Sequence, residues 1–225
     1  MSAAEPPPCR EPRDIEGNLK RYLGDRDPTA RYFSFDYCFN FFQAHRDRDD
    51  AATLASAETM EVACLHLGFY LASWGMLRGS TDLLQRSIKH FEGVIEAIAE
   101  APAAIWQIDA DNYDEEAWTL IRDFGDRLRI ALPNKTSEIL ITKIMLGVFG
   151  CVPAFDANFK NGSGLSTFGP GALRRVERFY CEHAELIERF RVPTLVFATG
   201  GTTTRRYSRA KVIDMIFFIE GAGDE

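Results

Sequence analysis

The chain of 225 residues has the length of one globular domain, and its 46% hydrophobic and 26% charged residues are ordinary for a soluble protein. With 17 Phe, 7 Tyr and 3 Trp, this composition excludes a disordered chain, a collagen-like repeat and a small disulfide-stabilised scaffold. The net charge of −7, taken over the whole chain, argues against nucleic-acid binding, which depends on clustered cations.

The charges are unevenly distributed along the chain. Residues 1–121 hold 11 basic and 21 acidic side chains, whereas residues 122–225 hold 15 basic and 12 acidic ones. An anionic ligand is therefore expected against the C-terminal part, and ordinary solvated loops are the alternative explanation. Two segments there, 157–176 and 202–211, contain bases and no acid: Lys160, Arg174, Arg175, Arg205, Arg206, Arg209 and Lys211.

The cysteines and histidines form no recognisable metal motif. The five cysteines are an odd number without a CxxC pair, and the four histidines are separated in the sequence with no HExxH motif. We therefore expect reduced thiols in a cytoplasmic protein, with no metal and no cofactor. The proline-rich N-terminus lacks the apolar core of a signal peptide. No apolar run approaches the ~20 residues that cross a bilayer, so no membrane partner is expected.

The hydrophobic pattern predicts an all-α fold, a single compact domain of about eight helices at residues 14–225 after a flexible N-terminal segment at 1–13. Asp14 is a suitable cap for the first helix. After a turn at Asp27, the dense aromatic run from Tyr32 to Phe42 is expected in the core. The predicted helices are 14–23, 32–45, 55–76, 81–99, 114–132, 136–149, 172–190 and 207–219, with a shorter helical piece at 154–160.

The regions between these helices carry signals of their own. Residues 100–116 contain six acids and no base, which favours a surface excursion. Residues 161–171 hold four glycines and a proline and are predicted to be a loop, and residues 194–197 are a candidate short strand. The core candidates of the two central amphipathic helices are Leu84, Ile88, Phe91, Ile95, Ile98, Trp118, Ile121, Leu128 and Ile130.

The residues that point to chemistry are Lys143 and Asp156. Lys143 lies in a helix that is otherwise apolar, and burial there disfavours the charged ammonium and favours a nucleophilic amine. Asp156 follows a proline-containing turn thirteen positions later, so a helix–turn–helix path returns it towards Lys143. An amine beside a carboxylate suits attack at the anomeric carbon of a sugar. The alternative is structural: Lys143 extends to solvent and Asp156 caps the next helix.

This stretch resembles the helix-hairpin-helix superfamily of DNA glycosylases, closest to the bacterial branch that is like the 8-oxoguanine glycosylases. The resemblance covers Leu132 to Phe159: the Thr142-Lys143 pair, an apolar helix, a glycine-containing turn and Asp156 three residues after Pro153. It implies an all-helical fold in which the lysine and the aspartate act on C1′ of a flipped nucleotide. The hairpin of that superfamily is glycine-rich, close to LPGVGxxTA. Residues 132–137 here lack glycine, so they either contact phosphate differently or match by accident.

Other side chains are candidates for holding the substrate. Trp74 is followed by Gly75, Arg78 and Gly79, an arrangement that suits a stacking wall with a phosphate contact. The alternative is a core tryptophan beside a helix end, with Arg78 answering the helix dipole. The candidates for phosphate contacts are Arg78, Lys135, Arg174, Arg175, Arg205, Arg206 and Lys211.

From these observations we expect a DNA glycosylase that excises a damaged or modified base, and whose role is phage defence if that base belongs to phage DNA. The hypothesis requires a cavity wide enough for an everted nucleobase beside Lys143 and Asp156. Two alternatives stay open. One is a non-enzymatic helical protein, an antitoxin or a regulatory subunit, that binds a basic protein partner through its acidic N-terminal half. The other is an enzyme that processes nucleosides or nucleotides with the same Lys–Asp pair.

Overall fold

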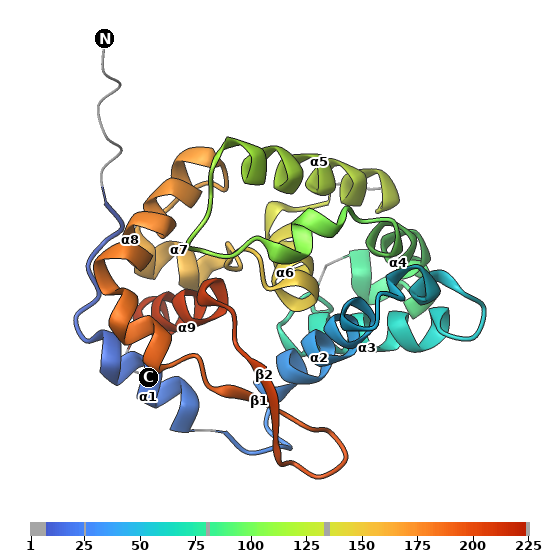
Figure 1. Ribbon diagram of the computed structural model, residues 1–225, viewed down its shortest axis with the longest axis horizontal. Coiled ribbons are helices and arrows are strands. Elements are labelled where there is room, and N and C mark those ends of the chain that lie inside the picture. Colours follow the sequence, from blue (N-terminus) through green and yellow to red (C-terminus); the bar gives the residue numbers. More distant parts are fainter. Residues whose placement is uncertain (1–7, 25, 80–81, 133–135, 224–225) are drawn as a thin grey trace.

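The computed structural model describes residues 8–24, 26–79, 82–132 and 136–223. Over these residues the fold is all-α with one short hairpin, which confirms the predicted fold class (Figure 1). None of the helices described is long and apolar enough to span a bilayer. The α-helices are α1 (Ile15–Gly24), α2 (Phe33–Asp47), α3 (Met60–Ser73), α4 (Glu92–Ala99), α5 (Glu115–Ala131), α6 (Glu138–Phe149), α7 (Ala157–Ser163), α8 (Pro170–Arg189) and α9 (Arg209–Ala222).

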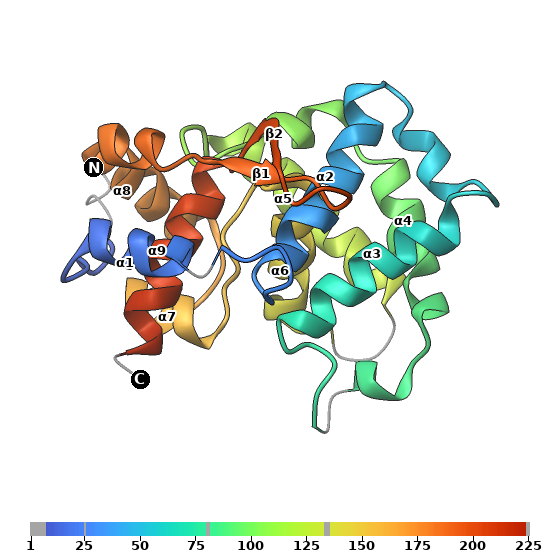
Figure 2. The ribbon, with the colours of Figure 1, turned by 90° about the horizontal axis from the view of Figure 1, so that it is seen from below.

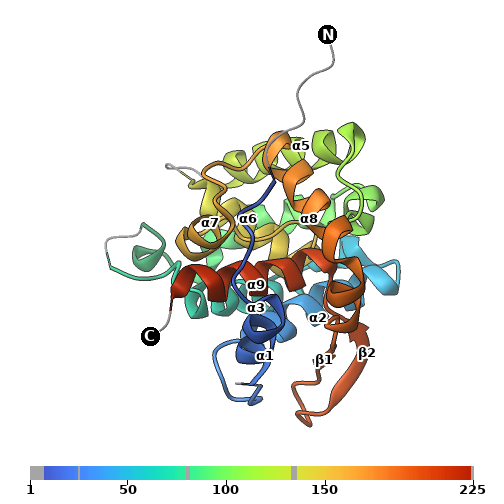
Figure 3. The same ribbon diagram turned by 90° about the vertical axis from the view of Figure 1, so that its left-hand side faces the viewer.

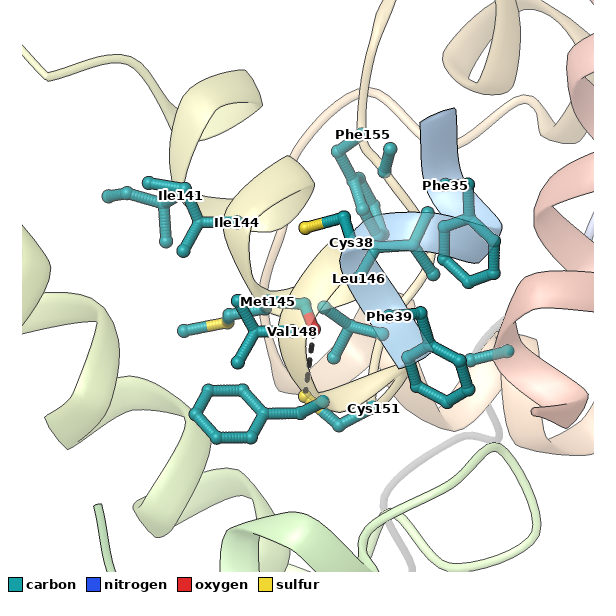
Figure 4. Packing of buried hydrophobic residues seen from close by; sticks show 14 of the residues in the cluster. Phe35, Cys38, Phe39, Ile141, Ile144, Met145, Leu146, Val148, Cys151 and Phe155 are labelled. Atoms are coloured by element: carbon teal, nitrogen blue, oxygen red, sulfur yellow. Dashed lines mark hydrogen bonds between the residues drawn. The ribbon is translucent and has the colours of Figure 1, made fainter. Parts of the chain in front are cut away.

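Two helices are almost wholly buried, and the others are arranged around them. Helix α6 buries ten of its twelve residues and packs against α2, α3 and α5. Helix α9 packs against α1, α7 and α8 (Figures 2 and 3). Apolar side chains from α2, α6 and the turn after α6 interdigitate around the centre of the molecule (Figure 4). The chain therefore forms an α6 group and an α9 group that meet along one boundary.

Two glycines allow unusually close packing, one within each helix group. A Cβ on Gly162 of α7 would lie 2.2 Å from the Phe217 carbonyl oxygen, so glycine is required where α7 touches the backbone of α9. A Cβ on Gly147 of α6 would lie 2.4 Å from the Tyr70 ring. Gly147 thus admits Tyr70 of α3, whose hydroxyl donates a hydrogen bond to the Lys143 carbonyl at 3.1 Å. These contacts fix how α3, α6, α7 and α9 approach one another.

The predicted helix at 81–99 is wrong as one continuous element. The chain forms two 3₁₀ turns, η2 (Asp82–Gln85) and η3 (Ile88–Phe91), before α4 begins. Extended backbone at Ser87 interrupts the helical path. The helical periodicity of this segment also predicted that Leu84 lies in the core, but Leu84 is 48% exposed. Similarly, Ile130 near the end of α5 is 82% exposed, because the apolar stripe of that helix ends at Leu128.

The predicted helix at 55–76 begins later than expected. A 3₁₀ turn, η1 (Ala51–Ala55), and a further turn precede α3, and the helix ends at Ser73, so it covers only the middle of that range. The expected strand at 194–197 is also shifted. It is β1 (Pro193–Leu195), and it pairs antiparallel with β2 (Thr202–Arg206), which the sequence pattern did not indicate.

The acidic segment at 100–116 is not a surface excursion. It contains η4 (Ala103–Gln107) and buries Trp106 and Tyr113. The Asp109 carboxylate accepts hydrogen bonds from the Arg209 and Ala210 amides at the start of α9. This acid is therefore a structural partner of a helix N-terminus, where negative charge is favourable.

Part of the predicted N-terminal lead-in is packed on the domain. Cys9 is buried, and the Arg10 amide donates to the Ser163 carbonyl at 2.8 Å. Arg13 forms an ion pair with Glu220 of α9. Residues 1–7 lie outside the described residues.

Candidate functional site

Lys143 and Asp156 meet at the boundary between the two helix groups. Lys143 Nζ lies 2.9 Å from Asp156 Oδ2, and their side chains are 4% and 16% exposed. The amine also donates to the Trp74 carbonyl oxygen at 3.2 Å. Lys143 therefore does not extend to solvent. The structure thus brings the Lys143 amine and the Asp156 carboxylate together, as the helix–turn–helix path predicted.

The turn between α6 and α7 brings this pair together. Helix α6 ends at Gly150, which adopts a left-handed conformation with φ of 69° and allows the chain to turn back. The Phe155 amide then donates to Thr142 Oγ1 at 3.0 Å. Because Thr142 precedes Lys143 and Phe155 precedes Asp156, this one hydrogen bond sets the register between amine and carboxylate.

Asp156 has a structural role as well. Its Oδ1 atom accepts a hydrogen bond from the Phe159 amide at 3.1 Å and caps α7, while Oδ2 contacts Lys143. The structural alternative for Asp156 is thus correct, but it does not exclude the ion pair. Each carboxylate oxygen serves one partner, so the cap holds the group that faces the amine in a fixed orientation.

A second lysine–aspartate pair lies beside the first. Lys211 Nζ is 3.0 Å from Asp214 Oδ2 and donates to the Tyr22 hydroxyl at 2.9 Å. Asp214 Oδ1 accepts from the Ala154 amide, so α9 is bonded to the same turn that carries Asp156. The prediction that Lys211 belongs to a surface set of phosphate ligands is wrong, because its side chain is only 1% exposed. Asp214 was not identified from sequence, although a lysine and an aspartate three residues apart in an apolar helix are a usable signal.

Both pairs line one small cavity. Its volume is about 10 Å³, and its other walls are Tyr70, Trp74, Leu146, Ala154 and Phe218. This is the space that a single water molecule requires. Among the residues that the structure describes, the cavity beside Lys143 and Asp156 is therefore too small for the everted nucleobase that was expected there, and Tyr70, Trp74 and Phe218 are its aromatic walls.

The electrostatics of the cavity depend on burial. Desolvation raises the pKa of Asp214, and the nearby Lys211 ammonium opposes that shift. The negative charge of Asp156 raises the pKa of Asp214 further. Burial also raises the pKa of Tyr22 well above its ordinary value, so its hydroxyl stays protonated. The site thus places two basic and two acidic side chains where water is scarce.

Trp74 forms one wall of the cavity. It has features of both predictions made for it, an aromatic wall and a tryptophan at a helix end. It is the C-cap residue of α3 and half-buried, and its ring centroid lies 5.5 Å from Lys143 Nζ and 5.1 Å from Lys211 Nζ. Its Nε1 atom is buried with no hydrogen-bond partner among the described residues. Arg78 is exposed, with its guanidinium beside Gly75. Arg31, which no sequence pattern indicated, is exposed, and its guanidinium lies 5.6 Å from the centroid of the Trp74 ring.

The remaining predicted phosphate ligands are not brought to this cavity. Arg205 bonds to Asn40 and Asp47, and Arg206 donates to the Arg191 carbonyl oxygen. Arg175 donates to the Pro8 carbonyl oxygen, and Arg174 is exposed on α8. Lys135 lies outside the described residues. None of the four described arginines lines the cavity.

The part of the chain that the structure describes contains no group of three or more His, Cys, Asp or Glu side chains that could hold a metal ion. The five cysteines are unpaired thiols, and all but Cys181 are buried. Burial raises the pKa of Cys64 to about 11, so this thiol is a poor nucleophile at neutral pH.

Comparison with known proteins gives no relative: no family model, no curated protein and no solved structure matches this chain.

Proposed function

We propose that this protein is a DNA glycosylase that excises a damaged or modified base, with Lys143 and Asp156 acting on the deoxyribose. One observation carries the proposal: the Lys143 amine and the Asp156 carboxylate are 2.9 Å apart in the interior. Removing two charges from water is costly, and apolar side chains of similar size are often no less stable in such a position. A buried pair of this kind therefore calls for a role other than stability, and chemistry at a sugar carbon is one that it fits. That role requires the cavity of about 10 Å³ beside the pair to widen before a nucleobase can enter.

In the proposed reaction Lys143 first passes a proton to Asp156. The neutral amine attacks C1′ as the bond from C1′ to the base breaks, and the base leaves with the bonding electrons and takes up the proton from Asp156. Asp156, once ionised again, stabilises positive charge on the sugar. The covalent product is an imine between Lys143 and C1′ after the sugar ring opens, and water hydrolyses it to an abasic site.

The surroundings support a nucleotide as the substrate. Trp74 is an aromatic wall next to the pair, and aromatic walls stack on bases irrespective of sequence. Arg31 and Arg78 are exposed cations close to Trp74 and its following glycine, where phosphates would follow a base into the cavity. These two arginines replace the more distant arginines as the expected phosphate contacts.

The closed cavity and the net charge of −7 favour a second candidate, an enzyme that acts on free nucleosides or nucleotides with the same pair. Such a substrate would need no extended basic surface. Turnover of free deoxynucleosides, with no activity on duplex DNA, would select this candidate.

The test uses duplex oligonucleotides that each carry one lesion, 8-oxoguanine first. Base release is measured under single-turnover conditions by alkaline cleavage at abasic sites, and the imine is trapped with borohydride. Lys143→Ala and Lys211→Ala are compared, because both amines face the cavity. Lys160→Ala is the matched control, since Lys160 forms a half-buried pair with Glu138 that does not line the cavity.

We expect Lys143→Ala to abolish the trapped adduct and to lower base release by about 100-fold or more, and Lys160→Ala to change neither. Loss of the adduct in Lys211→Ala alone would assign the attack to the second amine. Undiminished activity in Lys143→Ala, or no base release by the unmodified protein from any lesion, would refute the proposal. An intact fold must be shown for each variant by its thermal transition.

A further inference from the structure

Three aromatic rings form a stack beside the two lysine–aspartate pairs. The Tyr22 and Tyr32 rings are parallel within 6° with centroids 4.5 Å apart, and the Tyr32 and Trp74 rings are parallel within 11° at 5.4 Å. Tyr32 is therefore the middle ring of a sandwich. Phe218 meets all three rings edge-on and closes one side of the stack.

The outer rings are anchored and the middle ring is not. The Tyr22 hydroxyl is bonded to Lys211, and Tyr22 is 2% exposed on α1. Trp74 is held at the end of α3, where its carbonyl accepts from Lys143. Tyr32 is half-buried, precedes the first residue of α2, and its hydroxyl has no hydrogen bond within the described part of the chain. Ring contacts alone hold it.

The charges around the stack define what else fits between the outer rings. Lys211 Nζ lies 4.8 Å from the Tyr22 centroid and 5.1 Å from the Trp74 centroid, so an ammonium faces the edge of the middle position. On the exposed side, the Arg31 guanidinium lies 5.2 Å from the Tyr32 centroid. An occupant would therefore be a flat ring with a hydrogen-bond acceptor on its inner edge and an anionic group outside.

We propose that the space between Tyr22 and Trp74 is a stacking site for a nucleobase, and that the Tyr32 ring, which lies between them in this structure, gives way to the base. Rotation of one side chain vacates the site without moving a helix. The ligand is a nucleotide, with its base between the two rings and its phosphate at Arg31. This inference rests on the proposed function for its biological meaning, and Trp74, Lys211 and Phe218 connect the stack to the cavity that they also line.

The experiment measures binding alone. Calorimetric titration compares the unmodified protein with Tyr32→Ala, using deoxyadenosine monophosphate, a short single-stranded oligonucleotide and cyclohexanol as probes. We expect Tyr32→Ala to bind the nucleotide about tenfold more tightly, because no internal ring has to be displaced. Cyclohexanol, which cannot stack, should not gain. Tighter binding of the oligonucleotide than of the mononucleotide would identify DNA as the source of the base.

Matched variants distinguish base stacking from a non-specific loss of packing in the protein. Tyr32→Phe keeps the ring and should bind as weakly as the unmodified protein. Tyr37→Ala removes a half-buried tyrosine from the same helix outside the stack and should also leave binding unchanged. Trp74→Leu in the Tyr32→Ala background should lose the gain. Tyr32→Leu, which keeps apolar bulk, replaces Tyr32→Ala if that variant does not fold.

Two outcomes would overturn the inference: no gain in nucleotide binding for a folded Tyr32→Ala or Tyr32→Leu protein, or an equal gain for cyclohexanol. Lys160→Ala combined with Tyr32→Ala should bind like Tyr32→Ala alone, because Lys160 pairs with Glu138 and does not contact the stack. Nucleotide binding without base release would refute the proposed glycosylase activity but not the stacking site. Base release without a gain in binding for the Tyr32 variants would refute the stacking site but not the glycosylase activity.

Discussion

Asp156 contacts Lys143 with one carboxylate oxygen and the Phe159 amide with the other. The two functions can be separated by substitution, because asparagine is as good a helix cap as aspartate but carries no charge. We expect Asp156→Asn to lose base release while keeping the cap. Asp156→Ala should lose both and be less stable than Asp156→Asn by about 1 kcal/mol. Urea unfolding measures the difference, and equal stabilities would show that the cap contributes nothing.

The Lys211–Asp214 pair predicts a strong, asymmetric effect on stability. Lys211→Met leaves the Asp214 charge buried without its ammonium, which should lower the free energy of unfolding by about 3–5 kcal/mol. Combining it with Asp214→Asn removes the stranded charge and keeps an acceptor for the Ala154 amide. The double variant should therefore be more stable than Lys211→Met alone in urea unfolding. If the second substitution only adds to the loss, the pair is not coupled as described.

The contact between α7 and α9 should not tolerate a methyl group. Gly162→Ala places a Cβ 2.2 Å from a backbone oxygen of α9, so the two helices must separate. We expect a loss of at least about 3 kcal/mol in the free energy of unfolding. Gly171→Ala is the control, because no atom lies within 4 Å of the added Cβ at the start of α8. A Gly162→Ala protein as stable as the control would contradict the packing.

Burial of Asp36 should make stability depend on pH. Desolvation raises the pKa of Asp36 to about 6, against the hydrogen bonds that it accepts from Tyr207 and the Leu195 amide. Because the folded state holds this proton more tightly than the unfolded state, the contribution is full below about pH 4 and is lost as the pH rises to about 6. The loss amounts to at most about 3 kcal/mol.

Asp36→Asn cannot ionise and should not show this loss. Its free energy of unfolding relative to the unmodified protein should therefore increase between about pH 4 and pH 6, and then stay constant. Denaturant unfolding at several pH values measures the difference, which cancels the titration of other groups. A difference that does not change with pH would show that Asp36 titrates alike in both states.

The features that sequence predicted are those with short-range causes. Lys143 and Asp156 were placed together because a helix, a glycine-containing turn and a cap connect them within fourteen residues. The aromatic run at the start of α2 was expected in the core, and Phe35, Phe39 and Phe42 are there. Helix periodicity failed at Ser87, where one extended residue changes the direction of the chain.

The features that sequence missed depend on residues far apart in the chain. Tyr22 and Lys211 are separated by 189 positions, and Tyr32 and Trp74 lie at the ends of different helices. Lys211 was grouped with the predicted phosphate contacts because residues 202–211 contain no acid. Its partner Asp214 lies one helical turn after that segment. Asp109 was assigned to the surface by its acidic neighbours, but the N-terminus of α9 holds it inside. Local composition contains no information about such partners.

The close packing of α7 on α9 has a mechanical consequence. Asp156 and the Lys211–Asp214 pair are carried by one stiff unit, while Lys143 and Trp74 belong to the other. The Lys143–Asp156 contact and the hydrogen bond from the Phe155 amide to Thr142 join the two units, so a displacement of one unit against the other would lengthen both. The distance between Lys143 Nζ and Asp156 Oδ2 therefore depends directly on how the two units are placed against each other.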